Sequence, residues 1–309
     1  MKRKGELQFS FAWIFAIIAG AFILFLAIFG VTKFIGIEKT SSDAQTAKDI
    51  SVLLNPLESS FESGKKSLIS TQAETRIYTG CSETGFFGKQ LIKTNQKIDN
   101  KWSETDINIV SQNKYIFSKD YADGKDFYIY SKPFNLPFKV ADLLYLTSSE
   151  DKYCFIEPPD EIENEILSWN SENLFIDANC PENSINICFK DGGNCNIVVN
   201  ENSKFVKKTN EIVYYEGNAL IYAAIFSDKE SYECQLKRLM KRTEQLSLIY
   251  KDKANFLFQK TGCSSALIPD LVVLGNYARN FDNSEDLSVI YNFADTLQTK
   301  NERSKCRLW

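Results

Sequence analysis

The longest apolar run of the chain lies close to its first residue. Leu7 to Thr32 is 26 residues long and contains no charged side chain. Phe9 to Gly30 would form a helix about 33 Å long, enough to cross a hydrocarbon core of about 30 Å. A secretory leader, the alternative, has an apolar core of about 7 to 15 residues and then small residues at its cleavage site. The pattern therefore predicts a retained transmembrane helix over residues 9–37, after a short tail over residues 1–8.

The charges that flank this run differ on its two sides. Lys2, Arg3 and Lys4 precede it against Glu6 alone, whereas Lys33, Glu38 and Lys39 follow it. Short cytoplasmic flanks are enriched in Lys and Arg. We therefore expect a single-pass protein of the cell membrane, with a cytoplasmic N-terminus, a C-terminal domain outside the cell, and the lipid bilayer as its first partner.

Helical periodicity continues past the membrane segment. Ile50, Leu53, Leu57 and Phe61 recur at helical spacing, and Asn55 with Pro56 is typical of a helix start. The pattern predicts a helical stalk over residues 38–74, in one piece or interrupted at the proline.

Residues 75–226 have the alternation and turn residues of a β-rich region. "KYIFSKDYADGKDFYIYS" predicts a hairpin around an Asp-Gly turn, and "INICFKDGGNCNIVV" predicts a second hairpin. "ALIYAAIF" also has the composition of a strand, and "DEIENEILSW" predicts one helix.

Residues 227–309 change to helical spacing. One long helix is expected from Asp228 to Gly262, and a second begins at Ser284. The basic stretch "KRLMKR" within the first helix has the pattern of a solvated helix face with salt bridges. The predicted fold class is α+β: a transmembrane helix, a helical stalk, a β-rich region and a helical C-terminal region.

All cysteines fall on the predicted outer side of the membrane. The eight residues are Cys81, Cys154, Cys180, Cys188, Cys195, Cys234, Cys263 and Cys306. An even number in an exported domain predicts disulfides, and Cys188 with Cys195 is the favoured pair because one predicted turn separates them. Zinc is the alternative, but the chain has neither His nor Cys-x-x-Cys. Reduced, buried cysteines of a cytosolic domain are the third reading.

Composition removes several classes of function. Without histidine there is no Ser-His-Asp or Cys-His site, and no phosphate-binding glycine loop is present. Residues 38–309 carry 32 basic and 39 acidic side chains, so their charge offers no attraction for nucleic acid. We expect no cofactor, no metal and no enzymatic activity. A hydrolase using two carboxylates stays open, because such pairs are defined by geometry rather than by spacing.

Three small residues share one face of the apolar run. Ala12, Ala16 and Gly20 are spaced by four, and small residues let transmembrane helices approach closely. This face is the candidate surface for a homo-oligomer or a membrane partner.

The first thirty residues resemble a known class of leader. "KRKG" followed at once by "ELQFSFAWIFAIIAGAFILFLAIFG" is similar to the class III signal peptide of type IV pilin-like proteins, particularly archaeal ones. The resemblance implies cleavage after Gly5, a mature chain that begins at Glu6, and an apolar helix that packs into a filament. The same opening is also similar to uncharacterised single-pass surface proteins of archaea.

Three hypotheses follow from these patterns. The first is a membrane-anchored surface protein whose outer domain, stabilised by disulfides, serves interaction or structure. The second is a pilin-like subunit processed after Gly5. The third is an extracellular carboxylate-dependent hydrolase.

Overall fold

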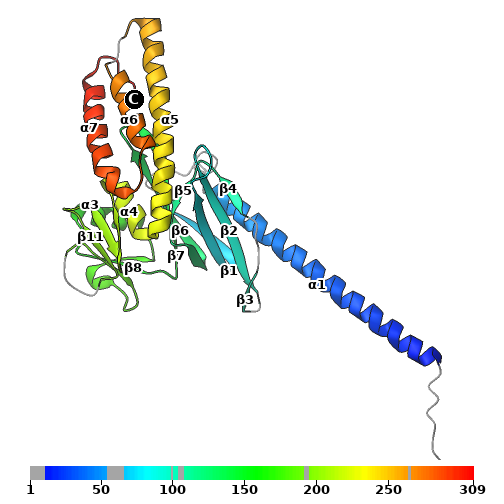
Figure 1. Ribbon diagram of the computed structural model, residues 1–309. Helices are drawn as coiled ribbons and strands as arrows, with labels where there is room; N and C mark the ends of the chain where they lie inside the picture. The colour runs from blue at the N-terminus through cyan, green and yellow to red at the C-terminus, as the bar shows by residue number, and fades with distance from the viewer. Residues whose placement is uncertain (1–10, 54–65, 99, 104–107, 191–194, 264–265) are drawn as a thin grey trace, which may run out of the picture.

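The computed structural model describes residues 11–53, 66–98, 100–103, 108–190, 195–263 and 266–309. Within the first helix it describes the side chains of residues 13–33 and 45–48. The architecture is α+β, as the sequence predicts, with one long N-terminal helix, two sheets and a group of C-terminal helices (Figure 1).

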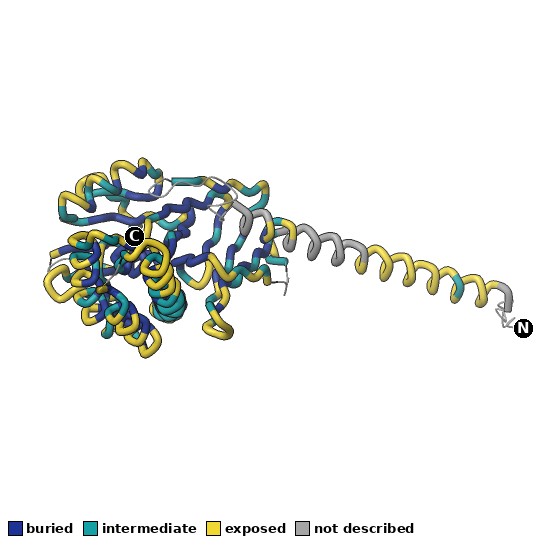
Figure 2. Tube along the Cα trace, turned by 90° about the horizontal axis from the view of Figure 1, so that it is seen from above, coloured by how far each residue is buried: buried dark blue, intermediate teal, exposed yellow. Residues whose placement is uncertain are grey.

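Helix α1 spans Phe11–Leu53, about 65 Å at 1.5 Å per residue. Its first part projects into solvent, and its far end reaches the first sheet (Figures 1 and 2). There Ala47 is 1 % exposed, and the Gln96 amide of the sheet donates to the Thr46 hydroxyl at 3.3 Å. The helix thus carries the folded part of the chain at its C-terminal end.

The first sheet has the strand order β3-β2-β1-β6-β7-β5, with β4 paired to β2. All its neighbours are antiparallel except β5 and β7, which are parallel. The strands are β1 (Lys66–Ser82), β2 (Lys89–Ile98), β3 (Lys101–Trp102), β4 (Ile109–Ser111), β5 (Tyr115–Phe117), β6 (Tyr121–Asn135) and β7 (Lys139–Ser148).

Both faces of this sheet bury apolar side chains. On β6, Tyr128 and Tyr130 belong to the main core, whereas Phe127 and Ile129 form a second cluster with residues such as Ile77. Because successive side chains of a strand point to opposite faces, the two clusters lie on opposite sides of the sheet. Residues 127–130 of β6 and 143–146 of β7 are therefore continuous apolar runs.

The second sheet has the strand order β13-β12-β11-β10-β8-β9. The neighbouring strands β9, β8, β10 and β11 run parallel to one another, whereas β12 runs antiparallel to both β11 and β13. The strands are β8 (Tyr153–Ile156), β9 (Leu174–Ile176), β10 (Ile185–Cys188), β11 (Ile197–Asn200), β12 (Phe205–Lys208) and β13 (Glu211–Tyr214).

Helices cover and join the two sheets. Helix α5 contacts strands of both sheets and packs along α6, which in turn contacts α7 (Figure 1). The helices are α3 (Asp160–Trp169), α4 (Gly217–Phe226), α5 (Lys229–Thr261), α6 (Ile268–Arg279) and α7 (Leu287–Arg303), with short 3-10 turns η1 (Asp177–Asn179) and η2 (Ser284–Asp286).

The predicted stalk is wrong in its last part. Residues 66–74, expected as helix, are the start of β1, where Ile69 is buried in the second cluster. The β-branched residues Ile69, Thr75 and Ile77 favour a strand, and pairing with β6 on one side and β2 on the other outweighs the helical pattern. Asn55, Pro56, Leu57 and Phe61 lie outside the described residues.

Neither predicted hairpin exists. The Asp123-Gly124 pair lies inside β6, where Gly124 pairs with Thr75, while β5 runs parallel to β7. Strands β10 and β11 are also parallel, so they do not form a hairpin. In the first segment non-local partner strands, absent from any local pattern, decide the pairing, whereas β10 and β11 pair with each other but in parallel.

"ALIYAAIF", expected as a strand, is helix α4. Every residue from Ala219 to Phe226 is buried, and α4 contacts strands of both sheets as well as α5. A short apolar run buried on all sides has no periodicity that separates strand from helix. The predicted helix at Asp160–Trp169 is confirmed, and α5 ends as expected at Gly262, which has φ +69°.

Candidate functional site

The apolar part of α1 is the clearest candidate for a functional element. Trp13–Lys33 is long and apolar enough to cross a membrane, and within the described part of the chain nothing covers it. Ala16 and Gly20 lie in this segment, and no atom comes within 4 Å of where a Cβ on Gly20 would stand. Gly5 and Glu6 lie outside the described residues, as does the side chain of Ala12.

All eight cysteines form disulfides. Cys188 pairs with Cys195, the pair favoured from sequence, at a Cα–Cα distance of 5.9 Å. Cys154 of β8 pairs with Cys180, which lies 26 residues further along the chain. Cys263, after α5, pairs with Cys306, after α7. Sequence alone left these last two pairings open.

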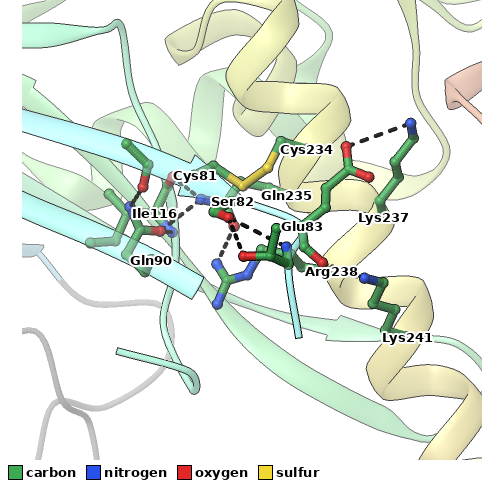
Figure 3. Close-up of a disulfide and its surroundings, with 12 residues drawn as sticks. Cys81, Ser82, Glu83, Gln90, Ile116, Cys234, Gln235, Lys237, Arg238 and Lys241 are labelled. Atoms are coloured by element: carbon green, nitrogen blue, oxygen red, sulfur yellow. Dashed lines mark hydrogen bonds and ion pairs between the residues drawn. A yellow bond between two sulfur atoms is a disulfide. The ribbon is translucent and has the colours of Figure 1, made fainter. Parts of the chain in front are cut away.

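The remaining disulfide joins the two halves of the fold. Cys81 of β1 pairs with Cys234 of α5 across a separation of 153 residues (Figure 3). The helical region is therefore tied covalently to the first sheet.

Beside this disulfide, Arg238 is buried completely. Its guanidinium donates to the carbonyls of Phe87 at 3.2 Å, Gln112 at 3.1 Å and Lys114 at 2.9 Å. It also lies over the Tyr115 ring at 4.8 Å. Desolvation lowers its pKa to about 10, which leaves it charged at neutral pH.

Two glutamines extend the same buried network. The Gln235 amide donates to Gln90 Oε1 at 2.7 Å and to the Ile116 carbonyl at 3.0 Å. The Gln90 amide in turn donates to the Gly80 carbonyl at 3.0 Å. These bonds satisfy polar groups that would be costly to bury alone, and they set the position of α5 against β1, β2 and β5.

This network is what sequence reasoning missed. "KRLMKR" was expected as a solvated face, and Lys237 does pair with Glu83 at 3.5 Å. Arg238, one residue further along the same helix, points instead into the protein. No local signal separates the two, because the carbonyls that hold Arg238 come from residues more than 120 positions away.

An acidic groove lies on the other side of the disulfide, at the start of α5. It consists of two adjoining pockets of about 480 and 390 Å³ that share Asp120. The first is lined by β1 and the first turns of α5, with Glu83, Glu230 and Glu233. The second is lined by Asp123, Glu150, Asp151 and Asp228, with Lys119 as its one basic residue.

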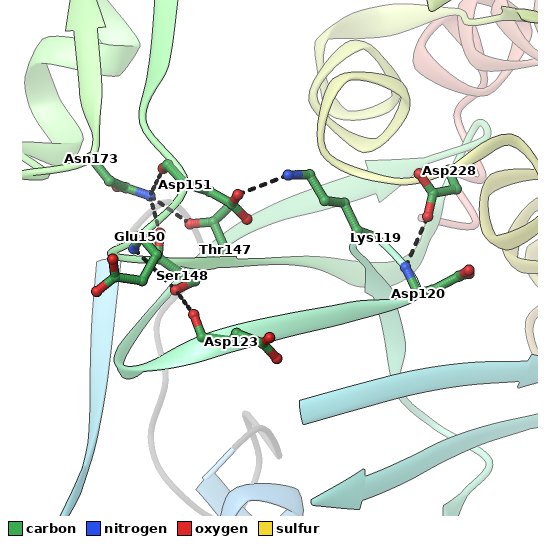
Figure 4. Close-up of polar contacts among 9 residues, drawn as sticks. All are labelled: Lys119, Asp120, Asp123, Thr147, Ser148, Glu150, Asp151, Asn173 and Asp228. Carbon is green, nitrogen blue, oxygen red and sulfur yellow. Dashed lines mark hydrogen bonds and ion pairs between the residues drawn. The ribbon is translucent and has the colours of Figure 1, made fainter. Parts of the chain in front are cut away.

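Hydrogen bonds hold the walls of this groove in place (Figure 4). The Asp228 carboxylate, expected to cap α5, accepts the backbone N–H of Asp120 at 2.8 Å. Lys119 pairs with Asp151 at 2.8 Å. The side-chain amide of Asn173, buried between the sheets, donates to Thr147 Oγ1 at 2.9 Å and to the carbonyls of Ser148 and Asp151.

A part-buried lysine lies behind the groove. Lys208 of β12 donates to the Ser227 carbonyl at the C-terminal end of α4. Burial lowers its pKa to about 7, with Lys119 acting in the same direction and Asp228 against it.

Another pocket, of about 510 Å³, lies between β13 and the start of α7. Glu216 and Glu285 line it together with Lys204 and Tyr215. Desolvation raises the pKa of Glu216. Glu216 and Glu285 thus share a pocket, which is what a carboxylate-dependent hydrolase would need. The hydrolase hypothesis stays a prediction.

No group of three or more Cys, Asp or Glu side chains in the described ranges could hold a metal ion. A comparison of the whole chain with known protein families, with characterised proteins and with solved structures finds no match.

Proposed function

We propose that this chain is a single-pass surface protein, anchored by the apolar part of α1 and carrying an outer domain for interaction or structure. One observation carries the proposal. The 21 residues Trp13–Lys33 form an uninterrupted helix with no cover in the described part of the chain, at a mean hydropathy of 2.9. A helix of this length without a polar face is stable among lipid tails, where its backbone groups are satisfied internally.

The disulfides support an outer location for the domain. Four bridges bring all eight cysteines together at Cα–Cα distances of 5.5 to 6.1 Å, and such bridges persist in oxidising compartments. The basic residues before the apolar run favour the same orientation.

Membrane extraction and protease protection in intact cells test this proposal together. We expect the protein to stay in the membrane fraction after alkaline carbonate washing, and external protease to digest the domain. Release by carbonate, or a mature chain that lacks the apolar helix, would contradict the anchor. Protection of the domain in intact cells would contradict the orientation.

A pilin-like subunit is the second candidate, and the continuity of α1 favours it. One helix runs from the exposed apolar segment to Ala47, which is buried against the first sheet. A single helix would then anchor the subunit before assembly and hold its head in a filament, as the resemblance of residues 1–30 implies.

Mass spectrometry of the native N-terminus decides between the two candidates. A pilin-like subunit begins at Glu6, whereas an unprocessed anchor retains Met1 to Gly5 or loses only Met1.

A Gly20→Arg variant tests lateral packing of α1. If the small-residue face pairs helices, this variant shifts the oligomer distribution in detergent towards monomer, and an Ile23→Leu control does not.

A further inference from the structure

The C-terminal end of α5 belongs to a basic surface, although the domain that carries it is acidic. The surface consists of residues 251–263 and 300–309, which the Cys263–Cys306 disulfide joins, and we call it the basic tip. It contains two acidic residues and seven basic ones, which are Lys251, Lys253, Lys260, Lys300, Arg303, Lys305 and Arg307. In contrast, residues 38–309 as a whole carry 32 basic and 39 acidic side chains.

Much of this positive charge has no use within the domain. Lys251 and Lys300 form ion pairs with acidic neighbours. The exposed Lys260, Lys305 and Arg307 form none with the described residues. Lys260 lies in the last turn of α5, where a positive charge stabilises the helix dipole. Lys305 and Arg307 follow α7, so they have no such role.

The basic tip also exposes two aromatic side chains. Phe256 is 57 % exposed and Phe258 is 56 % exposed. Because the two residues are two positions apart on a helix, their side chains lie on different sides of α5. Every residue from 255 to 262 is exposed except the half-buried Leu257. The last two turns of α5 therefore present phenylalanine on two sides.

The tail that follows α7 brings the basic and aromatic side chains together. The Cys263–Cys306 disulfide holds the tail at the end of α5. One turn or more further back along α5, Lys253 donates to the Leu308 carbonyl. The tail therefore runs along the last turns of α5, and the cations at positions 305 and 307 lie beside the exposed phenylalanines.

This combination is complementary to an anionic lipid surface. Phenylalanine is favourable where headgroups meet acyl chains, and Lys and Arg attract anionic headgroups. A soluble polyanion would use only the charge and leave both phenylalanines in water. The end of α5 and the apolar part of α1 also point in different directions from the domain (Figure 1). A bilayer that contacts the basic tip is therefore not the one that α1 would cross.

We propose that the basic tip binds the surface of an anionic lipid bilayer other than the one that holds α1. Phe256 and Phe258 enter the region between headgroups and acyl chains, and Lys260, Lys305 and Arg307 contact the headgroups. The protein then bridges two membranes. Binding at the tip does not need the anchor, whereas the bridge rests on the anchor proposed above.

Capture of vesicles by the full-length protein tests this proposal. The protein is reconstituted into phosphatidylcholine vesicles that are held on beads. Fluorescent vesicles of phosphatidylcholine, either pure or with about one third phosphatidylserine, are then added. The vesicle concentration at half-maximal fluorescence on the beads measures the affinity. We expect capture of the phosphatidylserine vesicles only, and capture that weakens as salt is raised.

The charge variant is Lys305→Gln with Arg307→Gln. Its control, Lys101→Gln with Lys207→Gln, makes the same charge change at one exposed position in each sheet. Each basic side chain near an anionic surface is worth about a fivefold change in affinity. The charge variant should therefore bind at least about tenfold more weakly, and its control less than about twofold more weakly.

The apolar variant is Phe256→Ser with Phe258→Ser. Its control is Phe86→Ser with Val110→Ser, which removes two exposed apolar side chains from the first sheet and its β1–β2 connection. The apolar variant loses the area that leaves water on binding, so it should also bind at least about tenfold more weakly. Thermal unfolding verifies that all four variants fold like the parent.

Several outcomes would overturn the proposal. These are equal capture of both vesicle types, no capture, and equal weakening in a variant and its control. Weakening in the charge variant alone would show a contact suited to a soluble polyanion, and it would overturn the proposal too. Retention of the chain in its own vesicles after carbonate washing tests the anchor separately, because carbonate removes proteins held only at the surface. If the chain is released, flotation with the same two vesicle types tests the tip.

Discussion

Arg238 shows how one residue can position a whole helix. Its guanidinium donates hydrogen bonds to three backbone carbonyls, from the segments around β2, β4 and β5. The planar group has enough donors to reach all three at once. Together with the Gln235 side-chain carbonyl, which accepts at 2.7 Å, these dipoles stabilise the positive charge of the arginine. Removing it takes this donor away from the buried Lys114 carbonyl and from the part-buried carbonyls of Phe87 and Gln112.

We therefore predict that Arg238→Met lowers the free energy of unfolding by about 2–4 kcal/mol. Arg238→Lys should recover less than half of that loss, because one ammonium group cannot reach three separated carbonyls. Urea unfolding with the disulfides intact measures both. Arg279→Lys is the control, since Arg279 forms an exposed pair with Glu244 and should change stability by less than about 0.5 kcal/mol. A fully stable Arg238→Lys protein would contradict the clamp.

Gly88 is required by the same arginine. Its φ is +63°, and a Cβ there would stand 2.6 Å from the Ser82 carbonyl oxygen and 2.7 Å from Arg238 Cγ. Gly85 also has positive φ, +92°, but a Cβ there would meet nothing within 4 Å. We predict that Gly88→Ala lowers the melting temperature clearly more than Gly85→Ala does, because only the first adds a steric clash to the backbone strain. Equal shifts in differential scanning fluorimetry would contradict this.

Lys208 should make stability depend on pH. Its pKa is about 7 in the folded state and near 10.5 in the unfolded chain, so between these values the unfolded state binds the extra proton. The contribution of Lys208 to stability therefore rises with pH across this window. We compare the free energy of unfolding of Lys208→Met with that of the parent. We predict that the variant gains most over the parent at or below pH 7, and that this gain declines towards pH 10. Urea unfolding at pH 6 to 10 measures it, and a difference independent of pH would refute the assignment.

At the scale of elements, local pattern and tertiary pairing compete. Helices α3, α5 and α7 follow the 3.6-residue pattern because one side of each is core and the other is solvent. Strands β6 and β7 carry buried residues on both faces, so alternation is lost. Helix α4 is buried on all sides and has no pattern at all. The prediction for α4 failed because that helix has no solvent side, whereas those for β1 and for β10 and β11 failed because strand pairing decided the outcome.

The disulfides should contribute unequally because they close different lengths of chain. Cys81–Cys234 spans 153 residues and joins β1 to α5, whereas Cys188–Cys195 spans 7 residues. Chain-entropy arguments give about 5 kcal/mol for the first and about 2.5 kcal/mol for the second. We predict that replacing both cysteines of the long loop by serine lowers the melting temperature more than the same change in the short loop. Non-reducing thermal unfolding measures this, and the reverse order would show that loop length does not dominate.

At the scale of the whole molecule, the protein is a folded domain at the C-terminal end of one long helix. Helix α1 is continuous over 43 residues, and only its far end contacts the sheet (Figure 2). The Cys81–Cys234 disulfide and Arg238 hold α5 against the first sheet, and α5 also contacts β13 of the second sheet. This arrangement places the groove where the first sheet meets the start of α5.

Charges within the apolar part of α1 test its role in anchoring. We predict that Ile23→Asp with Leu26→Asp shifts the protein from the membrane fraction to the soluble or degraded fraction, because two charges near the bilayer centre cost about 5–7 kcal/mol. The control is Ile249→Asp with Phe256→Asp on α5, where both side chains are already exposed. It should leave fractionation unchanged. Equal membrane retention of both variants would contradict anchoring by α1.

The sequence by itself determined the features that depend on composition along one segment. The uncharged run of residues 7–32 predicts a long apolar helix whatever the rest of the chain does, and the helices with one solvent-exposed face are visible in their spacing. Even the short Cys188–Cys195 bridge follows from nearness in the chain.

Only the tertiary structure decided what depends on distant partners. The parallel pairing of β5 with β7, the burial of α4, the Cys81–Cys234 bridge and the direction of Arg238 each need groups far away in sequence. The physical reason is that a backbone or buried polar group can bond to any partner of suitable geometry. Local residues therefore cannot specify which distant group becomes that partner. The groove arises in the same way, from carboxylates of β6, α5 and the β5–β6 and β7–β8 connections that only folding brings together.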